Sequence, residues 1–227
     1  MIVNVPVPPT PAATGPRLLE GRVGPDRPGA REPRPERGSS PRAGERVREL
    51  SRQQIEDRLG ELGDLFAETS GGGPWAWNQA RGAFLRRLVA DVRRPGFELL
   101  IAESTELTGC AYGFPVRGDG PRWEGLDAHH LQGSLLRLAA AGRLCVIAGI
   151  LVPPRVRRQN QDRAWNLARR LQKRLLADHG ATLGVMLVNR SDHRTLEALR
   201  SWGWRYAEGD ELPAYPYGPF RVLILGA

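Results

Sequence analysis

The chain of 227 residues is poor in cysteine and lysine and has no long apolar run. Its two cysteines, Cys110 and Cys145, exclude a framework of several disulfides and have no metal-binding spacing, so we expect two buried, inert thiols. No uninterrupted apolar stretch is long enough to cross a bilayer. The N-terminal residues lack the basic segment of a signal peptide and are interrupted by proline. The sequence therefore predicts a cytoplasmic protein with no metal site and no membrane partner.

The basic charge comes almost entirely from arginine, because Lys173 is the only lysine. The formal net charge is +8, which favours anionic partners such as phosphate groups, nucleic acid or acidic surfaces. Arginine in place of lysine, together with many alanine, glycine and proline residues, is also typical of a high-GC coding bias. The composition leaves both explanations open.

Proline is distributed unevenly along the chain. Ten of the 19 prolines precede Val47, in a segment with few large apolar residues and no hydrophobic period. Such a segment cannot bury enough apolar surface to offset the entropy cost of ordering it. We therefore predict a disordered Pro/Arg-rich tail over residues 1–47 and one domain over residues 48–227, which is long enough for a proper core.

Hydrophobic periodicity predicts two helices and a hairpin in the first half of the domain. Ser51 and Gln54 have the spacing of a capping box and begin one amphipathic helix. The apolar residues of that helix are Ile55, Leu59, Leu62 and Phe66. A second helix is expected over 78–92, after a Gly-rich loop. Apolar segments at 97–103 and 107–115 then indicate two strands joined by a short turn.

The second half alternates helices with apolar strands. The run Leu144–Val152 is almost continuously apolar, which is typical of a central strand that is buried on both faces. The other expected elements are a short helix near 131–139, a helix over 162–179, a strand over 182–188, a helix over 191–202 and a closing strand over 220–225. This alternation predicts a mixed sheet with helices on both faces.

The segment from Gly149 to Ala164 is the most informative part of the chain. An apolar strand end and two prolines precede an Arg-rich turn that opens a helix. Backbone N–H groups and the positive end of the helix dipole point there at one place, which suits a phosphate or diphosphate. Leu151–Pro154 followed by Arg157 resembles the strand end and turn of the acetyl-CoA-binding core of the GCN5-related N-acetyltransferase (GNAT) family. Asn160 and Asp162 stand where that family has its two turn glycines.

This resemblance covers roughly residues 50–225. It implies an α/β (α+β) fold with a GNAT-like mixed, mostly antiparallel central sheet and helices on both faces. For the family's first strand, Arg46–Leu50 is the best local candidate and Ile2–Val7 a remote one. The resemblance also implies acetyl-CoA as the acyl donor. The residues that match the cofactor turn are Leu151, Val152, Arg157, Arg158, Gln159, Asn160, Gln161, Asp162 and Arg163.

Two hypotheses remain open for this turn. Asn160 is a mild replacement for glycine, because asparagine tolerates a left-handed backbone. The carboxylate of Asp162 would be favoured near a helix N-terminus and would act as an internal anion in the phosphate site. Its repulsion of a phosphate would cost about 1 kcal/mol or more, which Arg155 and the other turn arginines would offset. Alternatively, the turn is a solvated helix start that Asp162 caps.

The resemblance also shows which of the usual proton-transfer residues are replaced. Trp202-Gly203-Trp204 matches the end of a further family segment, and Asp192 falls where the family has asparagine. Leu199 falls at the tyrosine that often protonates the departing thiolate, and we expect it to be helix core. Gly149 falls where many members have a glutamate on the central strand.

Glu103 is the candidate general base, with Glu124 and His129-His130 as weaker alternatives. Each of these side chains has a simpler explanation as a solvated polar group. Within the resemblance, a backbone N–H at a bulge in the central strand polarises the acetyl carbonyl, here around Leu151 and Val152, and proximity supplies much of the rate.

Four residues are candidates for the acceptor side, which would hold a small-molecule or peptide amine. They are Trp75, Trp77, Asn78 and Trp123. Exposed tryptophans in a Gly-rich loop indicate a binding surface, although packing onto the core explains them equally well.

The leading hypothesis is an N-acetyltransferase that moves an acetyl group from acetyl-CoA to an amine. The alternative is a catalytically degenerate GNAT-fold protein that binds a ligand or partner without turnover. Nucleic-acid binding through the basic stretch Arg155–Arg174 and the basic N-terminal tail is the least supported, because no known reader motif is present.

Overall fold

The computed structural model describes residues 45–70, 73–116, 133–159, 161–207 and 220–227. Residues 1–44 of the tail predicted over 1–47 lie outside the described residues. Several candidate site residues also lie outside them. They are Trp123, Glu124, His129, His130 and Asn160.

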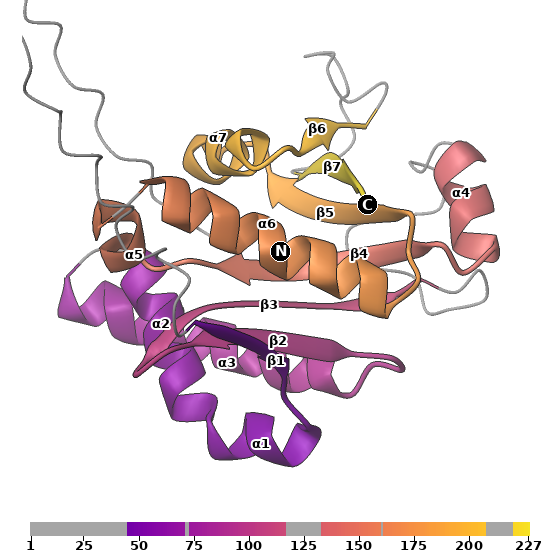
Figure 1. Ribbon diagram of the computed structural model, residues 1–227. Helices are drawn as coiled ribbons and strands as arrows, with labels where there is room; N and C mark the ends of the chain where they lie inside the picture. Colours follow the sequence, from indigo (N-terminus) through magenta and orange to yellow (C-terminus); the bar gives the residue numbers. More distant parts are fainter. Residues whose placement is uncertain (1–44, 71–72, 117–132, 160, 208–219) are drawn as a thin grey trace, which may run out of the picture. The chain divides into compact units, whose positions relative to one another are not determined.

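Seven strands of the described chain form one mixed sheet in the order β1-β2-β3-β4-β5-β7-β6 (Figure 1). Within this sheet only β4 and β5 run parallel, and all other neighbours are antiparallel. The strands are β1 (Arg46–Glu49), β2 (Glu98–Glu103), β3 (Leu107–Pro115), β4 (Leu144–Leu151), β5 (Leu183–Asn189), β6 (Arg205–Tyr206) and β7 (Phe220–Gly226).

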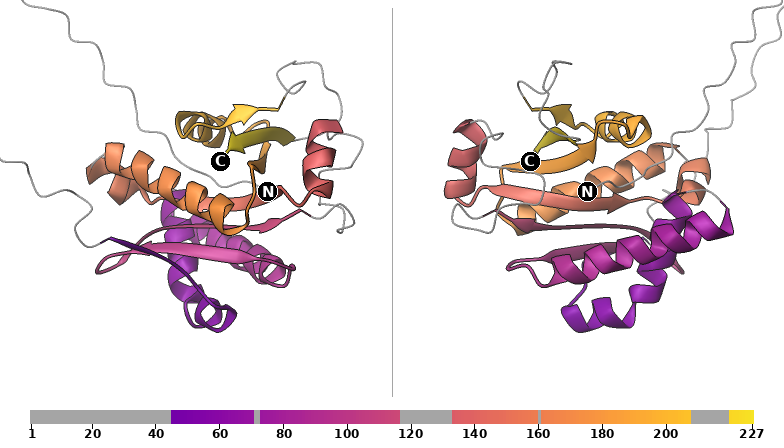
Figure 2. Two further views of the ribbon diagram at one scale, coloured as in Figure 1. Left: turned by 45° about the vertical axis from the view of Figure 1, so that its right-hand side comes forward. Right: turned by 180° about the vertical axis from the view of Figure 1, so that it is seen from behind.

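The helices of the described residues connect these strands. They are α1 (Arg52–Asp57), α2 (Leu59–Ser70), α3 (Pro74–Val92), α4 (Gly133–Ala140), α5 (Pro154–Gln159), α6 (Gln161–Asp178) and α7 (His193–Ser201). Helix α6 lies on one face of the sheet, and α2 and α3 lie on the other (Figures 1 and 2). The mixed, mostly antiparallel sheet with helices on both faces is therefore confirmed.

Alternation of side chains along β3 explains how both faces of the sheet are covered. A Cβ added to Gly109 would lie 3.2 Å from Leu167 of α6. Tyr112, three residues further along, instead packs its ring against Phe84 of α3. Successive residues of a strand point to opposite faces, so one strand supplies the core beneath both helical layers.

The strand β1 confirms the candidate at Arg46–Leu50. It pairs antiparallel with β2, and Arg46 lies opposite Glu103. Because β1 already begins at Arg46, the predicted domain boundary between residues 47 and 48 falls inside a strand.

The capping box at Ser51 is present as predicted, with the Ser51 hydroxyl accepting from the Gln54 N–H and the Gln54 side chain accepting from the Ser51 N–H. The single helix predicted after it was wrong, because the chain forms α1 and α2 with a break at Arg58. The Arg58 guanidinium turns from this break to Glu103 at the end of β2, with 2.7 Å between nitrogen and oxygen. The break between α1 and α2 thus lies at a residue that contacts a distant strand. Hydrophobic periodicity along the sequence does not reveal such a long-range contact.

Helix α3 begins at Pro74, four residues before the predicted start, with Gly73 as its N-cap. Proline is favoured at the first position of a helix, where its missing N–H has no intrahelical partner to lose. Trp75 and Trp77 therefore lie in the first turn of a helix, and their prediction as loop residues was wrong, whereas Asn78 was expected to be helical. The Trp75 side chain is 73 % exposed.

Helix α6 is fastened to the turn after α7 through one buried amide. The Gln172 side chain donates to the Trp202 carbonyl oxygen at 3.1 Å and accepts from Trp204 Nε1 at 2.9 Å. All three residues are buried. The Trp202-Gly203-Trp204 segment is therefore structural, because it meets the only polar side chain that α6 buries in its described part.

Replacing Gln172 with leucine removes both hydrogen bonds and leaves the Trp204 N–H and the Trp202 carbonyl without this partner. We expect a loss in the free energy of unfolding of about 1–3 kcal/mol for each buried group left unsatisfied. Urea denaturation measures this loss. Lys173→Leu is the matched control, because Lys173 is the exposed neighbour on α6 and should change stability by less than about 0.5 kcal/mol. Equal stability of the two variants would contradict the role given to Gln172.

A second buried polar contact joins His179, the residue after α6, to β2. Glu98 is 8 % exposed, and its Oε2 lies 3.5 Å from His179 Nε2. Burial, reinforced by a hydrogen bond and charge from Asp178 and by the charge of Glu49, raises the pKa of Glu98 to about 8, against a lowering by Arg174. Burial lowers the pKa of His179. Near neutral pH the carboxyl group of Glu98 therefore keeps its proton in the folded chain.

This proton makes stability depend on pH. Unfolding releases it once the pH exceeds the ordinary value for a glutamate, so stability should fall as pH rises toward the folded-state pKa of about 8. Between pH 7 and 8 an unfolded histidine, with its ordinary pKa of 6.5, is mostly neutral, so His179 contributes little to the slope. Glu98→Gln should remove the fall in this window, measured by urea unfolding at several pH values. Glu56→Gln, on the exposed side of α1, should retain the wild-type slope.

Candidate cofactor and acyl-transfer site

The central strand β4 separates from its parallel partner after a short ladder. Leu144–Val146 pair with Leu183–Val185, but β4 continues to Leu151 and β5 to Asn189. Over Ile147–Leu151 the strand pairs with β3 on one side and with no described strand on the other. Backbone groups need hydrogen-bond partners, so this open edge of β4 suits an extended ligand.

The same stretch of β4 contains a bulge. Tyr112 of β3 lies opposite Gly149, but the next residue, Gly113, lies opposite Ile147, which leaves Ala148 as the extra residue. A bulge bends the strand and redirects its backbone groups. The predicted position around Leu151 and Val152 was wrong by three residues or more, because apolar composition does not reveal where a ladder shifts.

The predicted cofactor turn follows β4 at once. Leu151 and Val152 are buried, and the short helix α5 includes Arg157, Arg158 and Gln159. Sequence analysis missed α5, which again begins at a proline. The side chains of Arg157, Arg158, Gln159, Gln161 and Arg163 lie outside the described part of the structure.

Asp162 lies in the first turn of α6, and its side chain is exposed. The carboxylate therefore fills no buried pocket. Because α6 begins at Gln161, Asp162 is also not its N-cap. The carboxylate is placed where the helix dipole favours a negative charge.

Arg155 has a structural role that differs from the one predicted for it. Its Nε lies 3.2 Å from Glu68 Oε2 on α2, and its two Nη groups donate to Glu106 and to the Leu107 carbonyl oxygen. These partners come from two separate segments of the chain, because Glu106 and Leu107 are neighbours. The guanidinium thus fixes α5 against α2 and the β2–β3 turn, and its charge is already matched within the protein.

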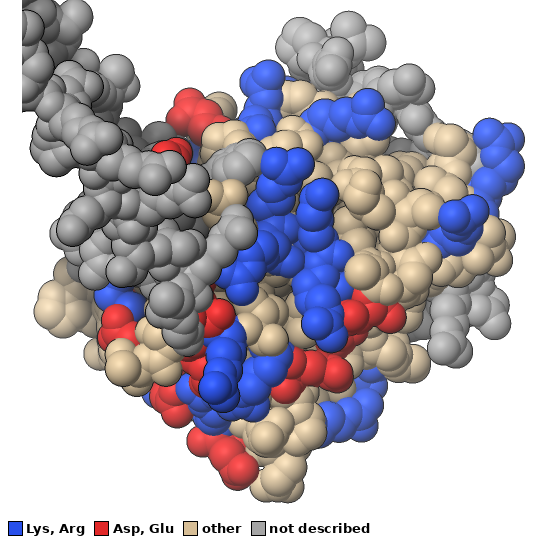
Figure 3. Space-filling model, viewed as in Figure 1, with Lys and Arg blue, Asp and Glu red and all other residues tan. Residues whose placement is uncertain are grey.

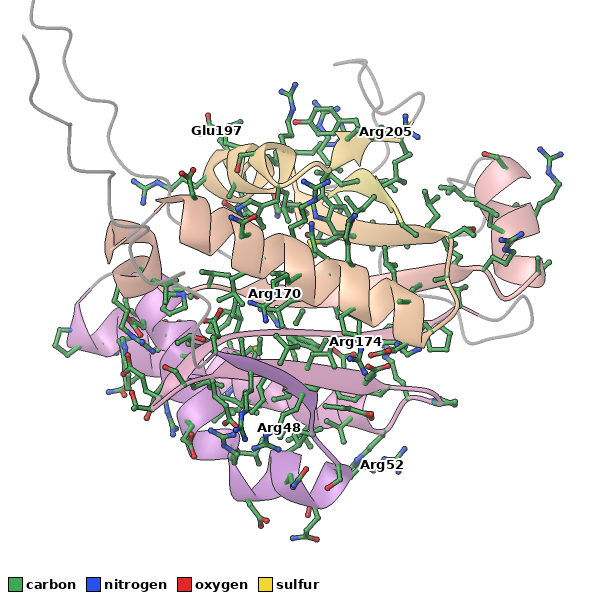
Figure 4. All side chains as sticks on the ribbon, viewed as in Figure 1. Arg48, Arg52, Arg170, Arg174, Glu197 and Arg205 are labelled. Atoms are coloured by element: carbon green, nitrogen blue, oxygen red, sulfur yellow. The ribbon has the colours of Figure 1, made fainter. Side chains whose placement is uncertain are left out.

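Basic side chains gather along the exposed side of α6, with acidic side chains beside them (Figure 3). Arg170 and Arg174 lie on successive turns (Figure 4). Arg170 pairs with Glu45 at 3.3 Å, and Arg174 pairs with Asp178 at 2.6 Å. The surface therefore has both signs of charge, which weakens the argument for nucleic-acid binding through this stretch.

Glu103 is held by two arginines at the end of β2. Its Oε1 accepts from Arg48 Nε at 2.6 Å, and its Oε2 accepts from Arg58 Nη1 at 2.7 Å. The hydrogen bonds from Arg48 and Arg58, and their charges, hold the pKa of Glu103 below its ordinary value. A carboxylate in this arrangement is a weak proton acceptor, so the geometry argues against Glu103 as the general base.

The α7 segment has the structural character expected of it. Leu199 is 1 % exposed and belongs to the core, as predicted. Asp192 caps α7, since its side chain accepts from the Thr195 N–H at 3.1 Å and from the Thr195 hydroxyl at 2.8 Å. Neither side chain is available to protonate a leaving group.

Tyr112 is the residue that sequence analysis missed. It is 2 % exposed and lies on β3 opposite Gly149. A Cβ added to Gly149 would lie 2.7 Å from the Tyr112 hydroxyl oxygen and closer still to its ring. The Tyr112 phenol thus occupies the space that a side chain at position 149 would need. Packing of Tyr112 therefore requires glycine at this position. The only signal in the sequence was a glycine inside a strong strand.

The two cysteines are free and buried, as predicted. Burial raises the pKa of the Cys110 thiol and raises that of Cys145 to about 12. Among the described residues, no three His, Cys, Asp or Glu side chains come together in a way that could hold a metal ion. None of the helices described combines the length and the apolar character needed to span a bilayer.

No family model and no curated protein matches this sequence. Solved structures do match it. An acetyltransferase from Streptococcus agalactiae has 16 % identity and a TM-score of 0.48, and the match covers 81 % of this chain and 99 % of that one. A protein from Desulfovibrio desulfuricans assigned to the GNAT family has 16 % identity and a TM-score of 0.47, with 80 % and 98 % covered. The PaiA N-acetyltransferase of Thermoplasma acidophilum, solved in complex with coenzyme A, has 9 % identity and a TM-score of 0.47, with 81 % and 99 % covered.

The strand order, with its one parallel pair among the described strands, follows the element order that the cofactor-turn resemblance implied. We conclude that this chain has a GNAT-like fold.

Proposed function

We propose that this chain is a cytoplasmic N-acetyltransferase that moves an acetyl group from acetyl-CoA to an amine of a small molecule or peptide. The observation that carries the proposal is the open edge of β4 over Ile147–Leu151, with a bulge at Ala148 and a helix start shortly after the strand ends. An open strand edge can pair with the amides of a pantetheine arm, and N–H groups at a helix start suit the diphosphate.

In this proposal the cofactor turn binds the diphosphate through the residues named from the sequence. The exposure of Asp162 and the support that Arg155 gives to α5 are compatible with this role. The bulge in β4 redirects a backbone N–H that can polarise the thioester carbonyl. Trp75, Trp77 and Asn78, at the start of α3, remain the proposed acceptor residues together with Trp123.

The acyl transfer proposed here relies on positioning. Glu103 is held in ion pairs, and Leu199 has no proton to give. An amine held against the thioester can still react, because placing two reactants in contact supplies a large part of a bimolecular rate.

Isothermal titration of the full chain with acetyl-CoA should give measurable heat and a single site. Arg157→Glu should weaken binding about tenfold or more, equivalent to about 1.4 kcal/mol, because it places a negative charge beside the proposed diphosphate. Arg86→Glu is the matched control. It makes the same charge change on an exposed residue of α3, which covers the other face of the sheet, and should leave affinity unchanged. An absence of heat at millimolar acetyl-CoA would reject the proposal.

The second candidate is a GNAT-fold protein that binds a ligand or partner without turnover. The ion pairs of Glu103 and the presence of leucine at position 199 favour it, because neither side chain is suited to moving a proton.

Restoring glycine at both turn positions separates the two candidates. Asn160→Gly with Asp162→Gly should raise affinity for acetyl-CoA if the natural turn is impaired, because a carboxylate and two side chains near the diphosphate are removed. A turn already fit for the cofactor should gain less than about threefold, below about 0.7 kcal/mol. Acetyl transfer to an amine by the unmodified chain, detected by mass spectrometry, would exclude the candidate without turnover.

A further inference from the structure

The outward side of α3 carries positive charge that no carboxylate of the described residues matches. Arg86 and the C-cap residue Arg93 are both exposed, and neither forms an ion pair with a described residue. The only carboxylate in the sequence of α3 is Asp91, which is buried and pairs with Arg94 at 2.9 Å. The two exposed guanidinium groups are therefore available to an acidic partner.

Trp75, one of the proposed acceptor residues, lies on the same side of α3 as these two arginines. Arg86 follows it by eleven residues and Arg93 by eighteen, which are close to three and five turns of a helix. Phe84 and Leu88, which α3 buries against the rest of the domain, lie on the opposite side. Trp75, Arg86 and Arg93 thus form one exposed line of side chains, which we call the α3 stripe.

Uncharged residues separate the charged ones along the α3 stripe. A Cβ added to Gly82 would lie 3.5 Å from an Nη of Arg86, so this guanidinium lies over a residue without a side chain. Val89 follows and is 41 % exposed between the two arginines. A surface that alternates basic and apolar groups suits a chain with acidic and apolar side chains. A nucleic acid, by contrast, favours a continuous basic track along its backbone.

The α3 stripe begins at the end of the sheet where the candidate acyl-transfer site lies. Arg155 of α5, the helix that follows β4, contacts Glu68 near the end of α2. Helix α2 ends at Ser70 and α3 begins at Pro74, and four residues of chain span at most about 14 Å. Figures 1 and 2 show α2, α5 and the start of α3 at this one end of the sheet. A chain lying on the stripe can therefore present one of its ends to the candidate site.

The spacing of the α3 stripe fits an extended peptide. With a rise of 1.5 Å per residue, Arg86 lies about 16 Å and Arg93 about 27 Å from Trp75 along the helix. An extended chain covers these distances in about five and about eight residues. From this alignment we propose that the acceptor is an acidic peptide segment. Its amine-bearing residue lies beside Trp75, and carboxylates about five to eight residues further along bind the two arginines.

This inference rests on the proposed acetyltransferase function and specifies its acceptor, a peptide rather than a small-molecule amine. Ion pairs at an exposed surface are individually weak, so the two arginines contribute selectivity and a faster encounter more than tight binding. The Trp75 ring offers a contact that acidic and neutral peptides share. Selectivity between peptides should therefore follow the position of their carboxylates.

Three peptides of equal length test the acceptor class. Each begins with a lysine, which supplies both an α-amine and a side-chain amine, and otherwise contains only small neutral residues. The first peptide has glutamate at positions 6 and 9, the second has glutamine there, and the third has its two glutamates at positions 2 and 3.

With the full chain and acetyl-CoA at low ionic strength, kcat/KM for the first peptide should exceed that for each of the others by about fivefold, the value of two exposed ion pairs. The advantage should shrink as salt is added, because screening weakens exposed ion pairs. Equal rates for the three peptides, or a preference for either of the other two, would overturn the inference.

Arg86→Gln combined with Arg93→Gln tests the α3 stripe itself. This double variant should lose the fivefold preference and keep the wild-type affinity for acetyl-CoA. Arg52→Gln with Arg137→Gln is the matched control, because it removes two charges from exposed residues of α1 and α4 and should keep the preference. Fluorescence anisotropy of the labelled peptides gives the same comparison as binding affinities, without turnover. An unchanged preference in the first double variant would contradict the proposed contacts, as would tighter binding of a thymidine oligonucleotide than of the first peptide.

Failure of this inference is distinguishable from failure of the proposed function. Normal binding of acetyl-CoA with equal acetylation of all three peptides, or with acetylation of none, overturns the acidic acceptor and leaves the cofactor site standing. Absence of acetyl-CoA binding ends both proposals.

Discussion

The parallel ladder between β4 and β5 is only three residue pairs long, and the arrangement of the candidate site depends on where it ends. Beyond Val146 the central strand has β3 as its one described neighbour, although it remains fully buried. Helix α6 runs from the far end of β4 back to the start of β5. The same separation therefore creates an open strand edge and sets the position of the helix start that follows it.

Much of the fold was readable from the sequence, because burial on both faces leaves a continuous apolar run. The run Leu144–Val152 and the later apolar segments gave the central strands close to their observed bounds. The capping box at Ser51 marked a helix start correctly. Helix starts at Pro74 and Pro154 were missed, because proline ends a helix in some contexts and begins one in others. Local residue types do not distinguish these contexts.

The sequence predicted where the candidate site lies along the chain, but not which residues contact one another there. The turn after β4 was located from its prolines and arginines, but its partners were not, since Glu68 and Glu106 are far from Arg155 in the chain. Glu103 was predicted as a candidate general base, but it forms ion pairs with two arginines. The sequence around a carboxylate at a strand end does not show that distant arginines will bind it. Tyr112 became visible only when strand register placed it against Gly149.

The three-way contact of Arg155 also has an evolutionary consequence. Its carboxylate partners, Glu68 and Glu106, belong to α2 and to the β2–β3 turn, and neither is part of the cofactor turn. A substitution at either position would release one side of α5 and alter the turn from a distance. Drift at these two acids is therefore coupled to the geometry of the turn, so sequences that lose one should show compensating changes at position 155.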